Sequence, residues 1–401
     1  MLTRRLGLLA SSLVFAGRAV HAQPKHPHPA HKGNDPAAPS GRPGDTPLGP
    51  VDTAARWGFI QDFDTGASLF EKQADDEMPP SSMTKLMTLY LVYDQLKQGK
   101  LKLEDQLPVT EKAWRMQGSK MFVSLGSSVK VEDLIRGVVV QSGNDAAIVL
   151  AEAIGGSEEQ FVEKMNAKAR ELGMTHTLFK NCTGWPDPDQ HMSCRDIATL
   201  AGDIIRQFPD YYHYDEEKTF RYNGIEQGNR NPMVQKGTAD GLKTGHTDAG
   251  GYGLVASSKR NGRRVILVLN GMATMRERAE EAERLMDWAF FNFEDVMLFS
   301  AGDAVETVPV WLGTSRSVPL IAGRDVMVTM PRNWRQKASI KVAYNAPLNA
   351  PVAKGFVAGK LTVTGDGVPQ LDIPLMAGAD VPRLGLPGRA MAVLSKYVTG
   401  T

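Results

Sequence analysis

The 401-residue sequence has little cysteine and no excess of charge of either sign. Its two cysteines, Cys182 and Cys194, are too few for a disulfide-rich scaffold or for a metal site with four cysteine ligands. Lysine and arginine number 46 against 45 aspartates and glutamates, so the net charge is +1. No surplus of positive charge is available to neutralise phosphates, and we expect no nucleic-acid partner. The 42% of apolar residues and 23% of charged residues are typical of a soluble globular protein.

Residues 1–22 have the three parts of a secretory signal peptide. Arg4 and Arg5 give a positive start, and residues 6–17 are an apolar stretch too short to span a bilayer. Residues 20–22 place small side chains at the −3 and −1 positions of a cleavage site. We expect export by the general secretory route to an oxidising compartment; twin-arginine export and an uncleaved anchor are the alternatives.

The rest of the chain divides into four segments of different composition. Residues 23–53 hold eight prolines and almost no large apolar side chain, which predicts a disordered, extended linker rather than a metal site at its histidines. Residues 54–298 mix helical and strand patterns, which indicates an α/β (α+β) domain. Residues 299–385 consist of short alternating runs between turn residues, which predict a small β-sandwich-like domain. Residues 386–401 form a short tail.

Within residues 54–298 the hydrophobic periodicity predicts individual elements. Two strands around residues 57–60 and 68–70 flank a turn at 64–66, and a further strand covers 264–269. Helical spacing predicts helices at residues 83–96, 131–154 with a break at 141–144, 157–172, 196–208 and 280–290.

The first motif with chemical potential is Ser82-Met83-Thr84-Lys85, at the start of a predicted helix. Residues three apart share a helix face, so the Lys85 ammonium is expected beside the Ser82 hydroxyl. A serine nucleophile needs a neighbouring base, and a lysine serves only if burial and nearby positive charge lower its pKa. A helix start directly after Pro79-Pro80 also leaves the Ser82 N–H free to face an oxyanion. Taken alone, the motif is typical of an ordinary helix N-terminus.

A second S-x-x-K match runs from Ser127 to Lys130. It precedes the apolar start of the predicted helix at residue 131 and is expected on a strand or turn, where residues three apart point in different directions. We therefore interpret this copy as a coincidental match.

Ser142-Gly143-Asn144 lies at the break between two apolar helical runs, which predicts a buried turn. Its hydroxyl and amide could pass a proton and hold a substrate amide. A helix N-cap is the alternative interpretation, because serine and asparagine both favour that position.

Lys243-Thr244-Gly245-His246 follows an apolar residue and precedes a second strand, which predicts an edge strand in a hairpin. Lys243 and Thr244 offer donors suited to a carboxylate, and Gly245 would let a substrate backbone approach closely. A polar edge strand without a catalytic role is the alternative.

The order of the three motifs resembles that of the low-molecular-mass penicillin-binding proteins, the serine-type D-Ala-D-Ala carboxypeptidases. Residues 83–88, 134–147 and 242–248 also look like this family, and the resemblance covers residues 54–293. The β-rich segment that follows resembles the smaller second domain of the same enzymes. The resemblance implies a β-lactamase/transpeptidase-like catalytic domain, in which helices flank an antiparallel sheet, and it implies no metal or organic cofactor.

The resemblance also implies a role for each motif residue. Ser82 would be the nucleophile that forms an acyl-enzyme, Lys85 its general base, and Ser142 a proton relay. The N–H groups of Ser82 and His246 would form the oxyanion hole. The implied substrate-binding residues are Asn144, Lys243, Thr244, Gly245, His246 and Arg278. Arg278 stands ten residues before Trp288, as the family pattern requires, and Arg276 is a nearby rival.

The implied substrates are peptidoglycan stem pentapeptides, which would lose their terminal D-alanine, and β-lactam antibiotics would be acylating inhibitors. The implied location is the periplasm. Family members often end in a long amphipathic helix, whereas residues 388–398 are short and carry few bulky apolar side chains. We therefore expect a soluble enzyme or one with weak peripheral contact with the inner membrane.

The loop at residues 181–192 departs from the family pattern, because Thr183 stands where a histidine is usual. This departure bears on deacylation and fine specificity. Cys182 and Cys194 flank the loop and could join in a disulfide; free buried thiols are the alternative.

Three other functions fit parts of the pattern. A class A β-lactamase needs a glutamate-activated water, and the loop at residues 181–192 contains no glutamate. A D,D-endopeptidase that cleaves peptidoglycan crosslinks can have the same motifs. A non-catalytic cell-wall-binding protein would not require Ser82, Lys85, Ser142 and Lys243 together.

Overall fold

The computed structural model describes residues 42–365 and 368–399. The expected signal peptide at residues 1–22 and residues 23–41 of the expected linker lie outside the described residues. Residues 42–53 differ from the expected disordered linker, because their backbone forms bridges from Gly44 to Val51 and from Asp45 to Glu71. Glu71 lies on an edge strand, whose exposed N–H and C=O groups give this segment a partner. The ordered domain therefore begins before residue 54.

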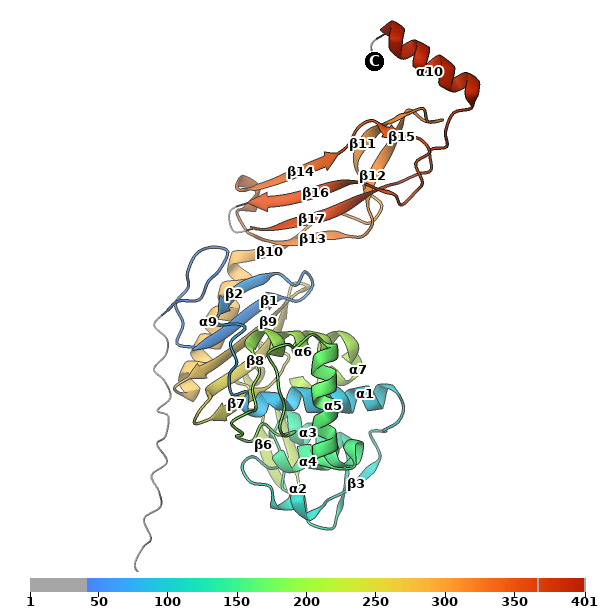
Figure 1. Ribbon diagram of the computed structural model, residues 1–401. Helices are drawn as coiled ribbons and strands as arrows, with labels where there is room; N and C mark the ends of the chain where they lie inside the picture. The colour runs from blue at the N-terminus through green and yellow to red at the C-terminus, as the bar shows by residue number, and fades with distance from the viewer. Residues whose placement is uncertain (1–41, 366–367, 400–401) are drawn as a thin grey trace, which may run out of the picture. The chain divides into compact units, whose positions relative to one another are not determined.

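The first domain, which we call the mixed domain, is built on a five-stranded antiparallel sheet in the order β2-β1-β9-β8-β7 (Figure 1). The strands are β1 (Trp57–Asp62), β2 (Ser68–Lys72), β7 (Thr244–Thr247), β8 (Gly251–Arg260) and β9 (Arg263–Met272). The expected hairpin of β1 and β2 and the expected edge strand β7 are confirmed.

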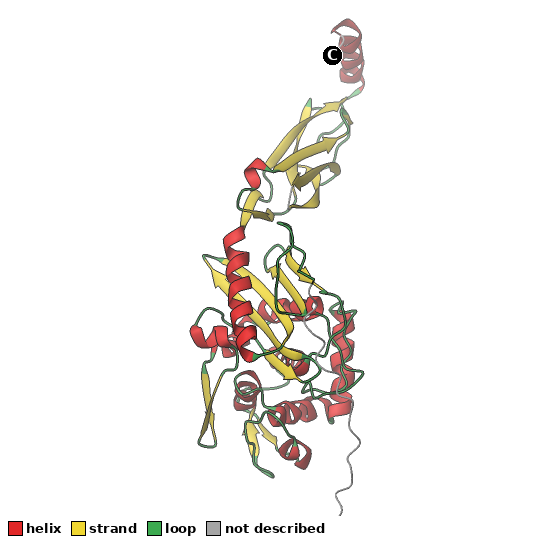
Figure 2. Ribbon diagram, turned by 90° about the vertical axis from the view of Figure 1, so that its left-hand side faces the viewer, coloured by secondary structure: helices red, strands yellow, loops and turns green. Residues whose placement is uncertain are grey.

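Both faces of this sheet are buried by helices. Helix α9 (Met275–Asn292) packs on one face, and Figure 2 shows it lying along the sheet and leading into the next strand. Helices α1 (Lys85–Lys97) and α6 (Cys194–Gln207) cover the other face. Successive residues of β9 enter opposite cores, with Ile266 beneath α6 and Leu267 beneath α9, as the two-residue repeat of a strand requires.

The remaining elements of the mixed domain lie beside α1. They are β3 (Gln106–Pro108), α2 (Glu111–Arg115), β4 (Ser128–Lys130), α3 (Val131–Val139), α4 (Asn144–Gly155), α5 (Glu158–Glu171), α7 (Pro209–Tyr212), β5 (Thr219–Tyr222), β6 (Ile225–Gly228), α8 (Pro232–Lys236) and the 3-10 helices η1 (Ser81–Thr84) and η2 (His213–Glu216). The expected break at residues 141–144 is confirmed between α3 and α4. Helix α9 begins before the expected residue 280, because the Thr274 side chain caps it by accepting from the Glu277 N–H.

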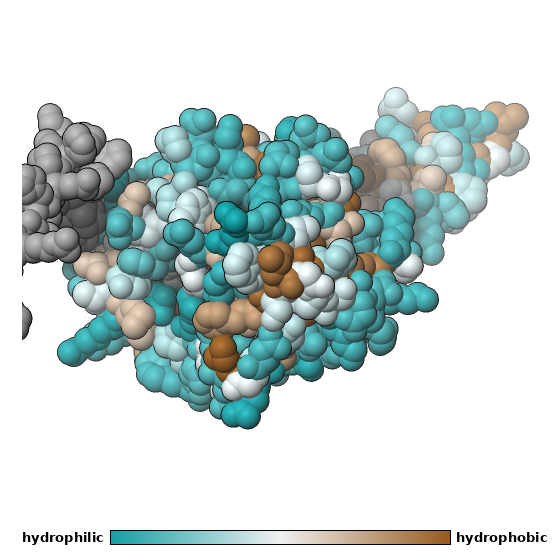
Figure 3. Space-filling view, turned by 90° about the horizontal axis from the view of Figure 1, so that it is seen from below, coloured by the Kyte–Doolittle hydropathy of each residue, from teal (hydrophilic) through white to brown (hydrophobic). Residues whose placement is uncertain are grey.

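Seen from below (Figure 3), the mixed domain is mainly hydrophilic, and apolar residues gather in small patches. Such a surface is typical of a face in contact with water.

The second domain, which we call the β domain, forms a sandwich of two sheets. One sheet has the order β14-β16-β17-β12-β11-β15, and the other pairs β10 with β13; residues of both enter one apolar core. The elements are β10 (Phe293–Phe299), β11 (Ala304–Trp311), β12 (Ser317–Ala322), β13 (Val326–Pro331), η3 (Trp334–Gln336), β14 (Ala338–Tyr344), β15 (Leu348–Asn349), β16 (Val357–Gly365) and β17 (Val368–Ala377). The expected all-β module is confirmed. The expected boundary between residues 298 and 299 falls inside β10, because α9 runs into this strand without a turn residue.

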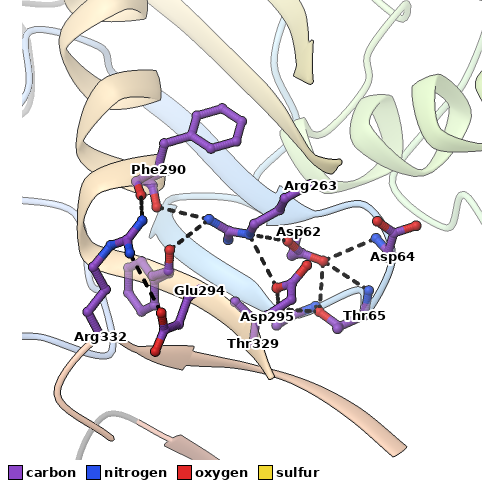
Figure 4. Close-up of polar contacts among 12 residues, drawn as sticks. Asp62, Asp64, Thr65, Arg263, Phe290, Glu294, Asp295, Thr329 and Arg332 are labelled. Atoms are coloured by element: carbon purple, nitrogen blue, oxygen red, sulfur yellow. Dashed lines mark hydrogen bonds and ion pairs between the residues drawn. The ribbon is translucent and has the colours of Figure 1, made fainter. Parts of the chain in front are cut away.

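A largely buried ionic cluster joins the two domains (Figure 4). Arg263 of β9 donates to Asp62 of β1 at 2.9 Å and to Asp295 of β10 at 3.2 Å. Thr329 of β13 donates to Asp295 at 2.8 Å and contacts Thr65 at 2.5 Å. Burial, and secondarily the negative charge of Asp62, raises the pKa of Asp295 to about 6.

The chain continues into α10 (Leu386–Thr399), where the sequence predicted a short tail. Leu386, Met391, Leu394 and Tyr397 are all largely exposed on this helix. In the described ranges no helix has both the length and the apolar character that a membrane span requires.

Candidate active site

The three sequence motifs meet at one cavity of about 670 Å³ in the mixed domain. Ser82 reaches it from η1, Ser142 from the turn before α4, and Thr244 from the edge strand β7. The described residues that line the cavity include no aspartate or glutamate but do include two arginines, Arg230 and Arg278. The cavity is therefore suited to a substrate that carries negative charge.

Lys85 is fully buried, and its Nζ contacts three oxygen atoms. They are Ser82 Oγ at 3.0 Å, Asn144 Oδ1 at 2.6 Å and the backbone oxygen of Thr183 at 2.5 Å. Burial lowers the pKa of Lys85 to about 7, and the nearby Arg230 charge acts in the same direction. A substantial fraction of this lysine is thus neutral near pH 7 and able to accept a proton from Ser82.

Ser142 and Lys243 form a second buried pair beside Lys85. Lys243 Nζ donates to Ser142 Oγ at 2.9 Å and to the Thr244 carbonyl at 3.1 Å, and both side chains are buried. Burial, together with the charges of Lys85 and two arginines, holds the pKa of Lys243 well below its usual value. The Ser142 hydroxyl is thus held by a donor, which suits it to pass a proton.

The N-cap interpretation of Ser142-Gly143-Asn144 is wrong. Gly143 occupies the cap position of α4, no side chain caps the helix there, and Ser142 has a left-handed backbone (φ 57°). Asn144 instead bridges the site, accepting from Lys85 through Oδ1 and donating to the Gln117 carbonyl through Nδ2 at 2.7 Å.

Strand β7 lies against η1 at Gly245. A Cβ atom on Gly245 would be 3.0 Å from Ser81 Cβ and 3.1 Å from the Pro80 carbonyl. The side on which a Cβ would stand is therefore filled by the chain itself, while Gly245 also lines the cavity, where a substrate backbone was expected to approach. The glycine keeps β7 close to Ser82, and His246 of the same strand lines the cavity.

The two candidate arginines differ in burial. Arg278 is only 7% exposed, lines the cavity and donates to the Arg230 carbonyl at 3.2 Å. Within the described residues its Nε has no hydrogen-bond partner. The Arg276 side chain is 84% exposed and pairs with Glu280 at 2.7 Å. Arg278 is thus the arginine available to an anionic ligand in the cavity.

Sequence reasoning missed Arg230, which lies between β6 and α8. Its Nη1 donates to Ser119 Oγ across the cavity, and burial lowers its pKa. The two partners are 111 positions apart, and no local pattern around Arg230 signals the contact.

The loop at residues 181–192 contributes a backbone atom to the site, because Lys85 is bonded to the carbonyl of Thr183. Cys182 and Cys194 are both buried and unpaired, so the disulfide is absent and the free-thiol alternative holds. Cys194 Sγ lies 3.8 Å from Met78 Sδ.

The second S-x-x-K match has the conformation that the sequence predicted. Ser127 Oγ donates to the Ser124 carbonyl at 2.7 Å, and Lys130 lies on β4, 4.0 Å from Glu132.

In the described part of the chain, no group of three or more His, Cys, Asp or Glu side chains is arranged to hold a metal ion.

Two family models match this sequence. One is described as D-alanyl-D-alanine carboxypeptidase and covers residues 45–274; the other is described as penicillin-binding protein 5, C-terminal domain, and covers residues 293–383. The second match begins at the first residue of β10, in agreement with the domain boundary in the structure.

Curated relatives match along most of the chain. D-alanyl-D-alanine carboxypeptidase DacA of Haemophilus influenzae is 38% identical over 360 residues, covering 88% of this chain and 91% of the relative. DacC of Escherichia coli is 38% identical over 346 residues, covering 84% and 86%. A D-alanyl-D-alanine endopeptidase of Pseudomonas aeruginosa is 31% identical over 239 residues and covers 57% of this chain.

Solved structures agree with these matches. Penicillin-binding protein 5 from Haemophilus influenzae superposes with a TM-score of 0.75 at 38% identity, covering 83% of this chain and 99% of that protein. Penicillin-binding protein D2 from Listeria monocytogenes, in its ampicillin-bound form, has a TM-score of 0.55 at 27% identity and covers 60% of this chain. The expected fold class, with a penicillin-binding catalytic domain and a C-terminal all-β domain, is confirmed.

Proposed function

The chain belongs to the family of D-alanyl-D-alanine carboxypeptidases and is a serine-type D-Ala-D-Ala carboxypeptidase; on this premise we propose that Ser82 carries its acyl-enzyme. The substrate is the peptidoglycan stem pentapeptide, which loses its terminal D-alanine. The observation that supports this proposal is the 3.0 Å contact between Ser82 Oγ and the buried Lys85 Nζ in a cavity that also holds Ser142 and Arg278.

Acylation begins when neutral Lys85 takes the hydroxyl proton of Ser82. Ser82 Oγ then attacks the carbonyl carbon of the penultimate D-alanine, and the resulting oxyanion faces the backbone N–H groups of Ser82 and His246. Ser142, held by Lys243, passes its proton to the leaving nitrogen and regains one from protonated Lys85, so the peptide bond breaks and free D-alanine departs. Water then attacks the ester carbonyl carbon and gives a proton to neutral Lys85. The bond from that carbon to Ser82 Oγ breaks, and Lys85 returns the proton to Ser82.

Recognition uses the positive end of the cavity. The buried Arg278 guanidinium and the Thr244 hydroxyl bind the terminal carboxylate of the substrate. Asn144 was expected to contact the substrate amide, but it is not among the described residues that line the cavity. Its amide is bonded to Lys85 and to the Gln117 carbonyl, so its role in this proposal is to hold Lys85. Lys243 keeps Ser142 in place as a hydrogen-bond donor, and Gly245 keeps β7 close to Ser82.

β-Lactam antibiotics acylate the same serine in this proposal. Their reactive amide and carboxylate occupy the places of the peptide bond and the terminal carboxylate. The similarity to an ampicillin-bound penicillin-binding protein supports this assignment.

The enzyme acts in the periplasm, after export directed by residues 1–22. The exposed apolar side chains of α10 support a weak peripheral contact with the inner membrane. Helix α10 has 14 residues and buries little area, so the anchoring it gives is weak.

The test compares purified wild type with Ser82→Ala, using a fluorescent penicillin and a peptide that ends in D-Ala-D-Ala. Wild type is expected to become labelled and to release D-alanine, and Ser82→Ala to do neither. Labelling without release from this peptide would favour crosslink cleavage by a D,D-endopeptidase. A wild type that is not labelled would favour a non-catalytic cell-wall-binding protein.

A further inference from the structure

The loop that presents the Thr183 carbonyl to Lys85 is folded around one side chain, that of Asn181. Its Oδ1 accepts from the backbone N–H groups of Thr183 at 3.2 Å, Gly184 at 2.8 Å and Trp185 at 3.0 Å. It also accepts from the Thr183 hydroxyl at 3.1 Å, while Nδ2 donates to the Trp185 carbonyl at 2.9 Å. One half-buried amide thus fixes the backbone of three successive residues.

This folded loop is packed directly against the nucleophile. Gly184 has a left-handed backbone (φ 79°), and a Cβ there would lie 1.8 Å from the Ser81 carbonyl and 2.9 Å from the Ser82 nitrogen. Thr88 of α1 donates to the Cys182 carbonyl at 2.7 Å. A movement of the loop toward η1 is therefore blocked, and a movement away from α1 would break the hydrogen bond from Thr88.

The consequence for Lys85 follows from the number of protons on a neutral amine. A neutral lysine has two N–H donors and one lone pair. Asn144 Oδ1 and the Thr183 carbonyl accept both donors, so the lone pair is left facing Ser82 Oγ. If the Thr183 carbonyl turned away, the amine would be free to rotate and lose this alignment.

We propose that Asn181 is a positioning residue for the general base, which holds the Thr183 carbonyl so that Lys85 presents its lone pair to Ser82. This role deepens the proposed function and rests on it. Residue 183 contributes its backbone oxygen to Lys85, so the contact is available with threonine in place of the histidine that is usual in the family.

The experiment measures the second-order rate of labelling by a fluorescent penicillin between pH 5 and pH 10. Asn181→Ala is expected to label about tenfold more slowly at pH 7. The midpoint of its acid limb is expected to move to higher pH, because a loosened loop admits water and the burial that lowers the Lys85 pKa is reduced. Asn181→Asp keeps the acceptor oxygen. Above the midpoint its rate is expected to return to within about threefold of wild type, while Asn181→Ala stays slow.

Asn166→Ala is the matched control. Asn166 is also half-buried and also organises the chain just before the loop, accepting from the Phe179 N–H at 2.9 Å and donating to the Phe179 carbonyl at 2.9 Å. This variant is expected to lower the melting temperature and to leave the pH midpoint unchanged.

An Asn181→Ala enzyme with a lower melting temperature but the wild-type rate and midpoint would overturn the proposal and leave a purely structural role. A wild type that is not labelled at any pH would instead overturn the proposed function. The two failures are thus distinguishable.

Discussion

The mixed domain contains two S-x-x-K segments that have the same spacing but differ in conformation and surroundings. At Ser82 the segment forms a 3-10 helix at the start of α1, and the lysine Nζ lies 3.0 Å from the serine Oγ. At Ser127 it enters β4, where the serine bonds a turn carbonyl and the side chain of Lys130 is 43% exposed. The first lysine is buried without a carboxylate within ion-pair distance in the described structure, while the second has Glu132 within 4.0 Å.

The difference shows which physical factors turn a spacing into chemistry. The helical turn places Lys85 beside the hydroxyl, and burial then lowers its pKa to about 7. The surroundings supply acceptors for its protons, so only the lone pair is left for Ser82. An exposed strand provides none of these conditions, although it contains the same residue types.

Replacing the lysine of each segment by alanine tests this comparison, and the expected effect on the labelling rate is the largest of those we predict. Lys85→Ala removes the proposed general base and is expected to slow labelling by a fluorescent penicillin by about 10³-fold or more. Lys130→Ala removes an exposed lysine and is expected to leave the rate within about twofold of wild type. Rates of labelling at pH 8 measure both effects, with circular dichroism as a check of folding.

The pH dependence of penicillin labelling by wild type tests whether burial lowers the pKa of Lys85. In the proposed mechanism only the neutral form of Lys85 accepts the proton, so the rate is expected to rise with pH through about 7 and then reach a plateau. At pH 6 about a tenth of the plateau rate is expected. A midpoint near 10 would contradict the role of burial.

Two arginines on α9 give a second comparison, with an intermediate effect. Arg278→Ala is expected to raise KM for a D-Ala-D-Ala peptide by about 10- to 100-fold, because it removes the desolvated guanidinium proposed to bind the terminal carboxylate. Arg276→Ala removes the same charge from an exposed position that pairs with Glu280, and KM is expected to change by less than twofold. Equal effects of the two variants would show that only the overall charge matters.

Parts of the fold could be predicted from the sequence because their signals are local. The hairpin of β1 and β2 alternates around a turn, and the break between α3 and α4 falls where apolar spacing is interrupted. The order in residues 42–53 could not be predicted, because the bridge from Asp45 depends on Glu71 of β2. The start of β10 was missed because the chain leaves α9 without a turn residue.

In the site too, contacts between residues close in sequence could be predicted, and contacts between residues far apart in sequence could not. Ser82 and Lys85 are three residues apart, so helical geometry alone predicted their contact. Arg230 was not predicted, because it meets Ser119 from 111 positions away. The contribution of residue 183 is a carbonyl oxygen, which every residue has, so no side-chain pattern could reveal it.

Two aspartates of the β domain, one half-buried and one exposed, give a third comparison. It concerns the stability of the fold, and its expected effect is the smallest. Asp295 is half-buried beside Asp62, and its pKa is raised to about 6, whereas Asp372 is exposed and pairs with Lys360 at 2.9 Å. A raised pKa means that the folded state holds its proton more tightly than the unfolded chain does. Stability is therefore expected to fall as pH rises from about 4 to about 6 and to level off above that range.

Asp295→Asn is expected to remove this decline and to raise the melting temperature at pH 7 by a few degrees, on the order of 2–4 °C. The amide oxygen can still accept from Arg263 and Thr329, and Asp62 remains as the ionic partner of Arg263. Asp372→Asn makes the same charge change at the exposed site and is expected to keep the decline between pH 4 and pH 6. Melting curves at half-unit pH intervals separate the variants, and an unaltered decline in Asp295→Asn would mean that other groups set it. Asp295 lies at the junction of the domains and far in sequence from Ser82. Penicillin labelling by both variants is therefore expected to match wild type. Such a result would show that the charge of Asp295 affects stability and not the reaction.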